Sequence, residues 1–164
     1  MMSIKLFWTF LFSLFFLTCF GQNSGTTFNK NAYYKIFAGA DVKSIDEELH
    51  IIQSASFTEK TAFEGALLMK KAGLVSTPKE KLTLFKEGRN KLETAISTRS
   101  DNVELRFLRL MIQENAPEIL NYKGNILTDS TLITNSYKTL PISLQQVIYD
   151  YSKKSKALIT DKLQ

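Results

Sequence analysis

The sequence predicts an all-α protein built from antiparallel helical hairpins, with about six helices after an N-terminal export signal. Apolar residues recur at the spacing of a helix face, and the strict alternation typical of half-buried strands is absent. Capping patterns, prolines and glycines separate the apolar segments, and the short connections make neighbouring helices antiparallel. The content of 44% hydrophobic and 23% charged residues is ordinary for a globular chain.

The first 21 residues have the three parts of a secretory signal peptide. A weakly basic start precedes the apolar run Leu6–Leu17, which is too short to span a bilayer. Small residues follow this run, and we expect signal peptidase to cleave between Gly21 and Gln22. The mature protein would then be exported to the periplasm or the extracellular medium, without a cysteine for a disulfide.

Cys19 allows an alternative, in which the protein is a lipid-anchored structural or stress protein of the cell envelope. A lipoprotein signal has Leu three residues before the cysteine and a small residue directly before it, whereas this chain has Phe16 and Thr18 there. The other interpretation is that Cys19 is one of the small residues that signal peptidase accepts. We expect contact with a membrane only if Cys19 is lipidated.

After the signal peptide we expect a flexible start at residues 22–29, which are mostly polar, and a single all-helical domain at residues 30–164. The helices are predicted from apolar positions that recur every three or four residues. In chain order they cover residues 30–40, 44–54, 56–72, 77–98, 102–115, 126–140 and 143–159.

The helix ends are predicted from capping residues. Thr77–Glu80 is the clearest start signal, because it combines a capping Thr, a Pro at the first helical position and a Glu three residues after the cap. Ser44–Glu47 is a second capping box. We expect Ser100 or Asp101 to cap the next helix, and Pro141 to separate the last two.

Small residues in the middle of the chain carry a resemblance. Phe85, Gly88 and Ala95, followed by the polar turn Ser100–Asn102, resemble the second helix of a tetratricopeptide repeat, and Gly65 would belong to the first helix. The separation of 88 − 65 = 23 residues exceeds the family spacing of about a dozen. The resemblance implies a TPR-like stack in which Gly88 contacts the helix that contains Gly65. An irregular helical bundle would explain the same residues.

A second resemblance rests on three segments together with the export signal. GALLMKKAG, LFKEGRNKLETAI and ELRFLRLMIQENAP resemble small exported proteins of the Bacteroidetes type. This resemblance implies a Gram-negative cell envelope or secretion, and it implies no activity.

Patterns typical of catalysis or cofactor binding are missing from the sequence, including a Gly-rich phosphate loop, a nucleophile elbow and a His-Glu-x-x-His helix. His50, the single histidine, is expected on a helix surface. The basic runs Lys70–Lys71 and Lys153–Lys156 lack the interleaved aromatic residues typical of nucleic-acid binding. We therefore expect no enzymatic activity, no cofactor, no metal and no nucleic-acid partner.

The candidate binding residues lie on and after the helix at 102–115. Arg106 and Arg109 share one face of a mostly apolar helix, so their guanidinium groups need either partners or a cavity. Glu114, Asn115 and Tyr122 follow where that helix ends. In the functional interpretation these residues line a groove in which bidentate donors bind a carboxylate, such as a peptide terminus.

The structural interpretation assigns the same residues to folding. Arg106 and Arg109 would pair with carboxylates such as Glu64 or Glu87, and Asn115 would cap the helix. Both interpretations agree with an exported helical scaffold or binding module that has a protein or peptide partner. An enzyme without a recognisable motif is the weakest alternative.

Overall fold

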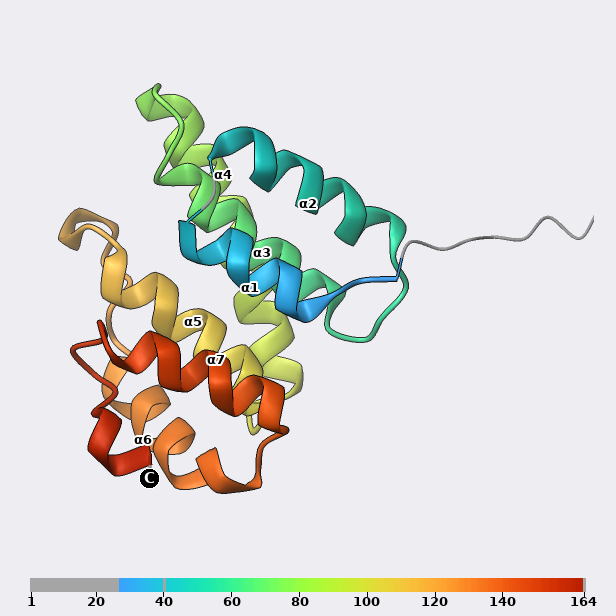
Figure 1. Cartoon of the computed structure of the whole chain (residues 1–164). Helices are drawn as coiled ribbons and strands as arrows, with labels where there is room; N and C mark the ends of the chain where they lie inside the picture. The colour runs from blue at the N-terminus through green and yellow to red at the C-terminus, as the bar shows by residue number, and fades with distance from the viewer. Residues whose placement is uncertain (1–26, 40, 164) are drawn as a thin grey trace, which may run out of the picture.

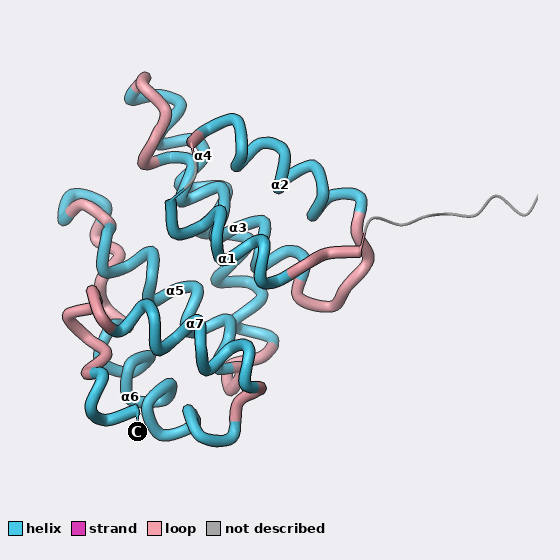
Figure 2. Tube along the Cα trace, viewed as in Figure 1, coloured by secondary structure: helices cyan, strands magenta, loops and turns pink. Residues whose placement is uncertain are grey.

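The structure is a computed structural model that describes residues 27–39 and 41–163 (Figure 1). These residues form seven α-helices and three short 3-10 helices and contain no strand, which confirms the all-α prediction (Figure 2). Cys19, Gly21 and Gln22 lie outside the described residues. The elements are α1 (Lys30–Gly39), α2 (Val42–Ser54), α3 (Lys60–Ala72), α4 (Pro78–Thr98), α5 (Val103–Asn115), η1 (Glu118–Leu120), α6 (Ile126–Ser136), η2 (Tyr137–Thr139), α7 (Ile142–Ser152) and η3 (Thr160–Leu163).

Helices α3 and α4 make the most extensive contact in the fold, and two glycines allow it. A Cβ atom on Gly65 would lie 2.6 Å from the carbonyl oxygen of Gly88 and 2.8 Å from the backbone nitrogen of Leu92. A Cβ atom on Gly88 would meet the Gly65 carbonyl oxygen and the backbone of Met69. The predicted contact of Gly88 with the helix that contains Gly65 is therefore confirmed, and the two backbones touch directly.

An aromatic cluster fills the space between α1, α3 and the α2–α3 connection. The rings of Phe28 and Phe57 stack at 4.3 Å between centroids, and both contact Phe63 edge-on. Tyr33 is fully buried beside them and donates a hydrogen bond to the Phe63 carbonyl oxygen. Phe28, which lies in the predicted flexible start at residues 22–29, packs its ring on the core.

The helix starts follow the capping rules, with shifts from the predicted residues. Helix α4 begins at Pro78 after Thr77, as predicted. Helix α2 begins at Val42, two residues before Ser44, and the Asp41 carboxylate caps it by accepting from the Ser44 backbone N–H. Helix α5 is capped by Asn102, one residue after the predicted pair. In α2 and α5 a short polar side chain that accepts from a free N–H group marks the start, whereas α4 starts with Pro78 at its first position and without a side-chain cap hydrogen bond from Thr77.

The last two helices are shorter than predicted. Helix α6 ends at Ser136 and passes into a 3-10 turn, and α7 ends at Ser152 rather than near residue 159. Leu158 is still buried, but it reaches the core from a turn, while Ile159 is 51% exposed. Within the described part of the chain, no helix is both long and apolar enough to cross a membrane.

Candidate functional site

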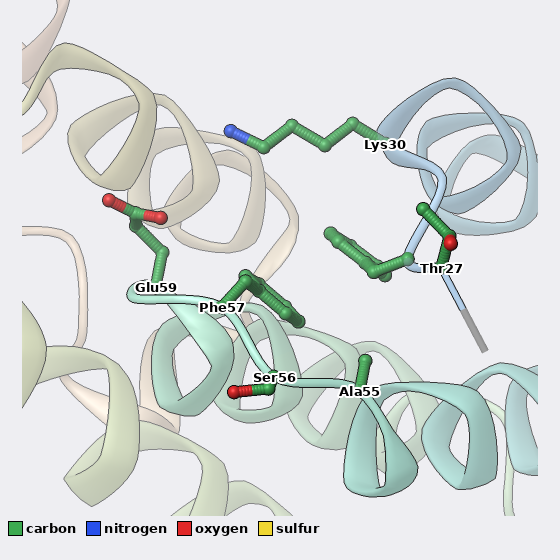
Figure 3. A pocket seen from close by; sticks show the side chains of 7 residues that line it. Thr27, Lys30, Ala55, Ser56, Phe57 and Glu59 are labelled. Atoms are coloured by element: carbon green, nitrogen blue, oxygen red, sulfur yellow. The ribbon is translucent and has the colours of Figure 1, made fainter. Parts of the chain in front are cut away.

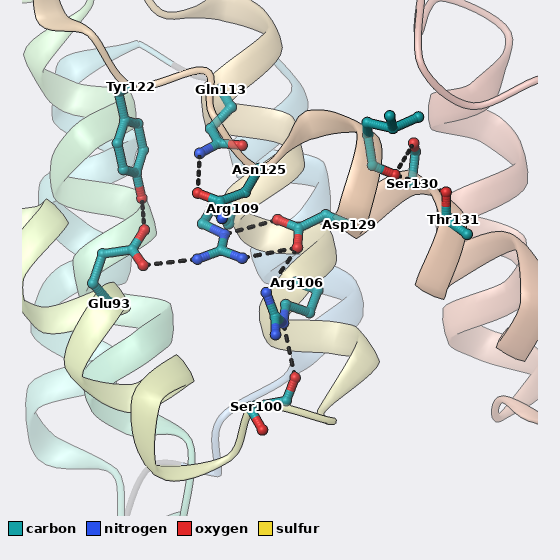
Figure 4. A network of polar contacts seen from close by, with 11 residues as sticks. Glu93, Ser100, Arg106, Arg109, Gln113, Tyr122, Asn125, Asp129, Ser130 and Thr131 are labelled. Atoms are coloured by element: carbon teal, nitrogen blue, oxygen red, sulfur yellow. Dashed lines mark hydrogen bonds and ion pairs between the residues drawn. The ribbon is translucent and has the colours of Figure 1, made fainter.

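Arg109 lies at the centre of a buried charge network between α4, α5 and α6 (Figure 4). Its Nε and Nη2 atoms donate to the two carboxylate oxygens of Asp129 at 2.7 and 2.8 Å, which is a bidentate fork. Its Nη1 atom donates to Oε2 of Glu93 at 2.8 Å. The Arg109 side chain is 4% exposed and that of Asp129 is fully buried, so the pair is shielded from water.

Arg106 lies one turn before Arg109 and joins the same carboxylate from the edge of the network. Its Nη1 atom donates to Oδ1 of Asp129 at 3.0 Å, and its Nε atom donates to the carbonyl oxygen of Ser100 at 2.8 Å. Asp129 therefore accepts hydrogen bonds from both arginines. The contact with Ser100 also ties the α4–α5 connection to α5.

Tyr122 closes the network from the loop between α5 and α6. Its hydroxyl donates to Oε1 of Glu93, so this carboxylate joins Tyr122 to Arg109. The ring packs edge-on against Phe85 at 5.5 Å, and the guanidinium carbon of Arg89 lies 4.8 Å from its centroid. Burial and the bonded Glu93 carboxylate raise the pKa of the Tyr122 hydroxyl, which keeps it a donor.

The guanidinium charge of Arg109 is stable in this environment. Burial disfavours the charged form, but the hydrogen-bonded carboxylates of Asp129 and Glu93 outweigh this effect and raise the pKa of Arg109. Two arginines and two carboxylates balance in formal charge. Every nitrogen of the Arg109 guanidinium donates to a carboxylate of the chain itself, so the fork that would bind a ligand carboxylate is already filled.

The predicted partners of the two arginines are wrong. Glu64 and Glu87 both pair with Lys91 on the other side of α4, at 3.0 and 3.7 Å. Sequence reasoning missed Asp129 and Glu93, although Asp129 carries a signal. It stands three residues after Ile126 and four before Ile133, in the buried register of α6, where a charge requires a partner.

Gln113, which lies beside this network, has a buried side-chain oxygen without a hydrogen-bond partner among the described residues. Its side chain is fully buried, and its Nε2 atom donates to Oδ1 of Asn125 at 3.3 Å. Its Oε1 atom has no hydrogen-bond partner in the described part of the chain. An unsatisfied buried acceptor costs roughly 1–3 kcal/mol.

Glu114 lies apart from the Arg109 network and holds the turn that follows α7. Its carboxylate accepts from the hydroxyls of Tyr151 and Ser155, both at 2.8 Å, and from the backbone N–H groups of Lys156 and Ala157 at 2.7 and 3.0 Å. These four bonds offer the chain an alternative to continued helix. They explain why α7 stops at Ser152.

Asn115 is also separate from the arginines. Its amide donates at 2.8 Å to the carbonyl oxygen of Met111, one of the last carbonyls of α5, so it satisfies the helix end. The structure thus brings together three of the five candidate residues, Arg106, Arg109 and Tyr122. Of the other two, Asn115 stabilises the end of α5, and Glu114 stabilises the turn after α7.

A pocket of about 370 Å³ lies beside the aromatic cluster (Figure 3). Lys30 and Glu59 approach it from α1 and from the start of α3. Each of them has a partner: Lys30 donates to Glu104 at 2.5 Å, and Glu59 accepts from Arg99 at 2.5 Å. Both charged side chains that line this pocket are therefore already paired with other residues of the chain.

The described residues contain no group of three or more His, Cys, Asp or Glu side chains that could hold a metal ion. The candidate network is thus built of arginine, carboxylate, amide and phenol groups, which fix geometry by hydrogen bonds. Comparison of the chain with protein-family models, with curated proteins and with solved structures finds no match.

Proposed function

We propose that this protein is an exported helical scaffold or binding module with a protein or peptide partner. The observation that carries the proposal is the filled fork of Arg109, whose three nitrogens bond to Asp129 and Glu93. The network fixes α4, α5 and α6 relative to one another, as a rigid scaffold requires. Export follows from the predicted signal peptide at residues 1–21.

The α3–α4 pair supports a TPR-like character for this scaffold. In such repeats, small residues let the two helices of a hairpin approach closely, and the stacked hairpins present a surface to a peptide. Gly65 and Gly88 provide such an approach here. The spacing between them and the buried charges of α5 and α6 are departures from the family pattern.

The experiment separates a scaffold from a ligand site at the arginines. Cells that produce the protein are treated with a cross-linker, and adducts of the wild type are compared with those of the double variant Arg109→Met with Asp129→Leu. Replacement of a buried ion pair by apolar residues is often neutral, and Arg106 and Glu93, which each lose one partner, are 16% and 34% exposed and can reach water, so we expect this variant to fold. A scaffold keeps the same adducts in the variant.

Two results would count against the proposal. A folded double variant that loses all adducts would make the network itself the binding site. A wild-type protein without discrete adducts would argue against a binding module. Circular dichroism of both proteins controls for folding.

Mass spectrometry of the mature protein tests export separately. We expect Gln22, free or cyclised, at the N-terminus. A diacylglyceryl group on Cys19 would instead support the lipid-anchored envelope protein.

A further inference from the structure

The pocket in Figure 3 lies between the segment that precedes α1 and the connection that joins α2 to α3. Phe28 lines it from the first segment, and Ala55, Ser56 and Phe57 line it from the connection. Its volume of about 370 Å³ falls within the range of roughly 300–1,000 Å³ that is typical of ligand pockets. A pocket of this size can receive one large side chain of a partner.

The floor of this pocket is aromatic. The rings of Phe28 and Phe57 stack with their planes 4° apart, and Phe63 supports both of them edge-on, with its centroid at 5.1 and 5.7 Å. Phe63 is fully buried, whereas Phe28 and Phe57 are only partly buried against the core. The core therefore fixes the position of the stacked pair and leaves part of its ring surface accessible from the pocket.

The charged side chains beside this floor favour an uncharged ligand. Lys30 pairs with Glu104, and Glu59 pairs with Arg99, both at 2.5 Å. Each pair balances in formal charge, so these four residues leave no net charge for a ligand to compensate. An ionic ligand would have to compete with a partner that is already in place, whereas an apolar side chain would gain contact with the rings at no such cost.

The connection beside the floor also offers main-chain hydrogen bonds. Ala55 has extended backbone angles, with φ −79° and ψ 156°. No backbone hydrogen bond among the described residues uses the N–H groups of Ser56 and Phe57, and Ser56 is exposed. In peptide recognition by strand addition, main-chain hydrogen bonds to an extended segment give affinity, and an adjacent pocket for a side chain gives specificity. Both features occur together here.

We propose that this pocket binds an extended, uncharged segment of a partner protein through one aromatic side chain. The ring of the partner packs on the stacked pair Phe28 and Phe57, and the main chain beside it bonds to the connection at Ser56. An aromatic ring is favoured over an aliphatic side chain because contact between rings adds to the gain from apolar burial. This inference rests on the proposed function, since it names the site and the class of peptide that the binding module recognises.

Titration with capped peptides, followed in amide NMR spectra of the full mature protein, tests the site directly. The probes are acetyl-Ala-Ser-X-Ser-Ala-amide, in which X is Phe, Leu or Ser. We expect the Phe peptide to shift the amide signals of Ser56 and Phe57. It should bind about threefold more tightly than the Leu peptide and about tenfold or more tightly than the Ser peptide. Absent shifts at these amides, or equal affinities for the three peptides, would overturn the proposal.

Two variants separate the ring from the main chain. Phe57→Leu keeps an apolar side chain but removes the aromatic face, so it should abolish the preference for the Phe peptide over the Leu peptide. Tyr149→Leu is the matched control, because Tyr149 is also partly buried against the core and does not line the pocket. Ser56→Pro removes an N–H group and Ser56→Ala keeps it, so only the proline should weaken the binding of the Phe and Leu peptides. A preference for the Phe peptide that persists in Phe57→Leu would contradict the site.

Cross-linking in producing cells distinguishes failure of this site from failure of the proposed function. Adducts that are lost in Phe57→Leu but kept in Tyr149→Leu would support the pocket as the partner's site. Adducts that persist in Phe57→Leu would overturn the pocket and leave the binding module intact, whereas a wild type without adducts would count against the binding module itself. Nuclear Overhauser contacts between the Phe57 ring and residues 22–26 would show that the chain's own N-terminal segment fills the pocket, and would also overturn the proposal.

Discussion

Helices α1–α4 and helices α5–α7 differ in what fills the space between them. In the first region the buried side chains are nearly all apolar, and Glu48 is the one buried charged or polar side chain among the described residues. The second region buries five polar or charged side chains, which are Arg109, Gln113, Asp129, Ser130 and Ser152. The first region is closed by direct backbone contact at Gly65 and Gly88, and the second by directed hydrogen bonds.

This difference makes the two regions sensitive to different substitutions. The backbone contact at Gly65 and Gly88 is disrupted when a substitution adds side-chain volume there, because the interior is already close-packed. A buried charge network is destabilised when a substitution removes one partner, because the remaining buried charge then has neither an opposite charge nor water beside it. Substitutions of the two kinds therefore test whether the two regions depend on different interactions.

Arg109→Ala should produce the largest effect. Removal of the guanidinium leaves the fully buried Asp129 with Arg106 alone and strands one oxygen of Glu93, so we expect a loss of about 3–5 kcal/mol in the free energy of unfolding. Chemical denaturation measures it. Arg99→Ala is the control: this arginine is 37% exposed and also bonds to a carboxylate, so its loss should cost about 1 kcal/mol or less. Equal losses would show that burial of the network contributes nothing.

Gly88→Ala should destabilise the first region by up to about 3 kcal/mol, although alanine is the better helix former. The new methyl group would overlap the Gly65 carbonyl oxygen and the Met69 backbone nitrogen, which cannot rotate away as a side chain can. Gly39→Ala is the control, because nothing lies within 4 Å of a Cβ atom at Gly39. A rise in melting temperature for Gly88→Ala would contradict the close helix contact.

Glu114→Gln should cost about 2 kcal/mol, because the amide can accept at only one of its two positions and lacks the negative charge that strengthens the four hydrogen bonds. Hydrogen exchange should increase at the N–H groups of Lys156 and Ala157. Glu118→Gln is the control, since Glu118 is exposed and its one ion pair among the described residues is with Lys123. Unchanged exchange would mean that the turn does not depend on the carboxylate.

The sequence rules succeed where the cause is local. Thr77 and Pro78 mark a helix start within two residues of sequence, and α4 begins there with Pro78 at its first position. Gly88 interrupts a helical pattern without ending it, which indicates close approach of another element. The partner helix, α3, directly precedes α4 in the chain, so the short connection between the two helices is enough to identify the partner.

The rules fail where the cause is a contact between distant segments. The partner of Arg109 is 20 residues away on another helix, and several carboxylates were equally available by spacing alone. The end of α7 depends on Glu114, which lies 41 residues before Ser155 in the sequence. An apolar stripe continues past Ser152 in the sequence, yet hydrogen bonds from another helix redirect the chain.

Glu48 provides a further test of this comparison, because it places a buried carboxyl group between helices α1–α4, where the other buried side chains are apolar. The residue is 3% exposed, and its Oε1 atom has no hydrogen-bond partner among the described residues. Desolvation raises the pKa of the Glu48 carboxyl above its ordinary value. A raised pKa in the folded state means that Glu48 favours folding most when protonated, and that this contribution is lost as the pH rises through the folded-state pKa.

Glu48→Gln should therefore be the more stable protein at about pH 8, by roughly 1 kcal/mol, because a neutral amide replaces a buried charge of similar shape. The advantage should shrink as the pH falls through the folded-state pKa, which lies above the ordinary value, because the wild-type carboxyl then becomes protonated in the folded protein. Denaturation of both proteins across this range measures the difference, and Glu47→Gln, whose side chain is exposed, should show little change with pH. A difference that grows as the pH falls would mean that Glu48 is stabilised as an anion, and the first region would then hold a charge in the same way as the second.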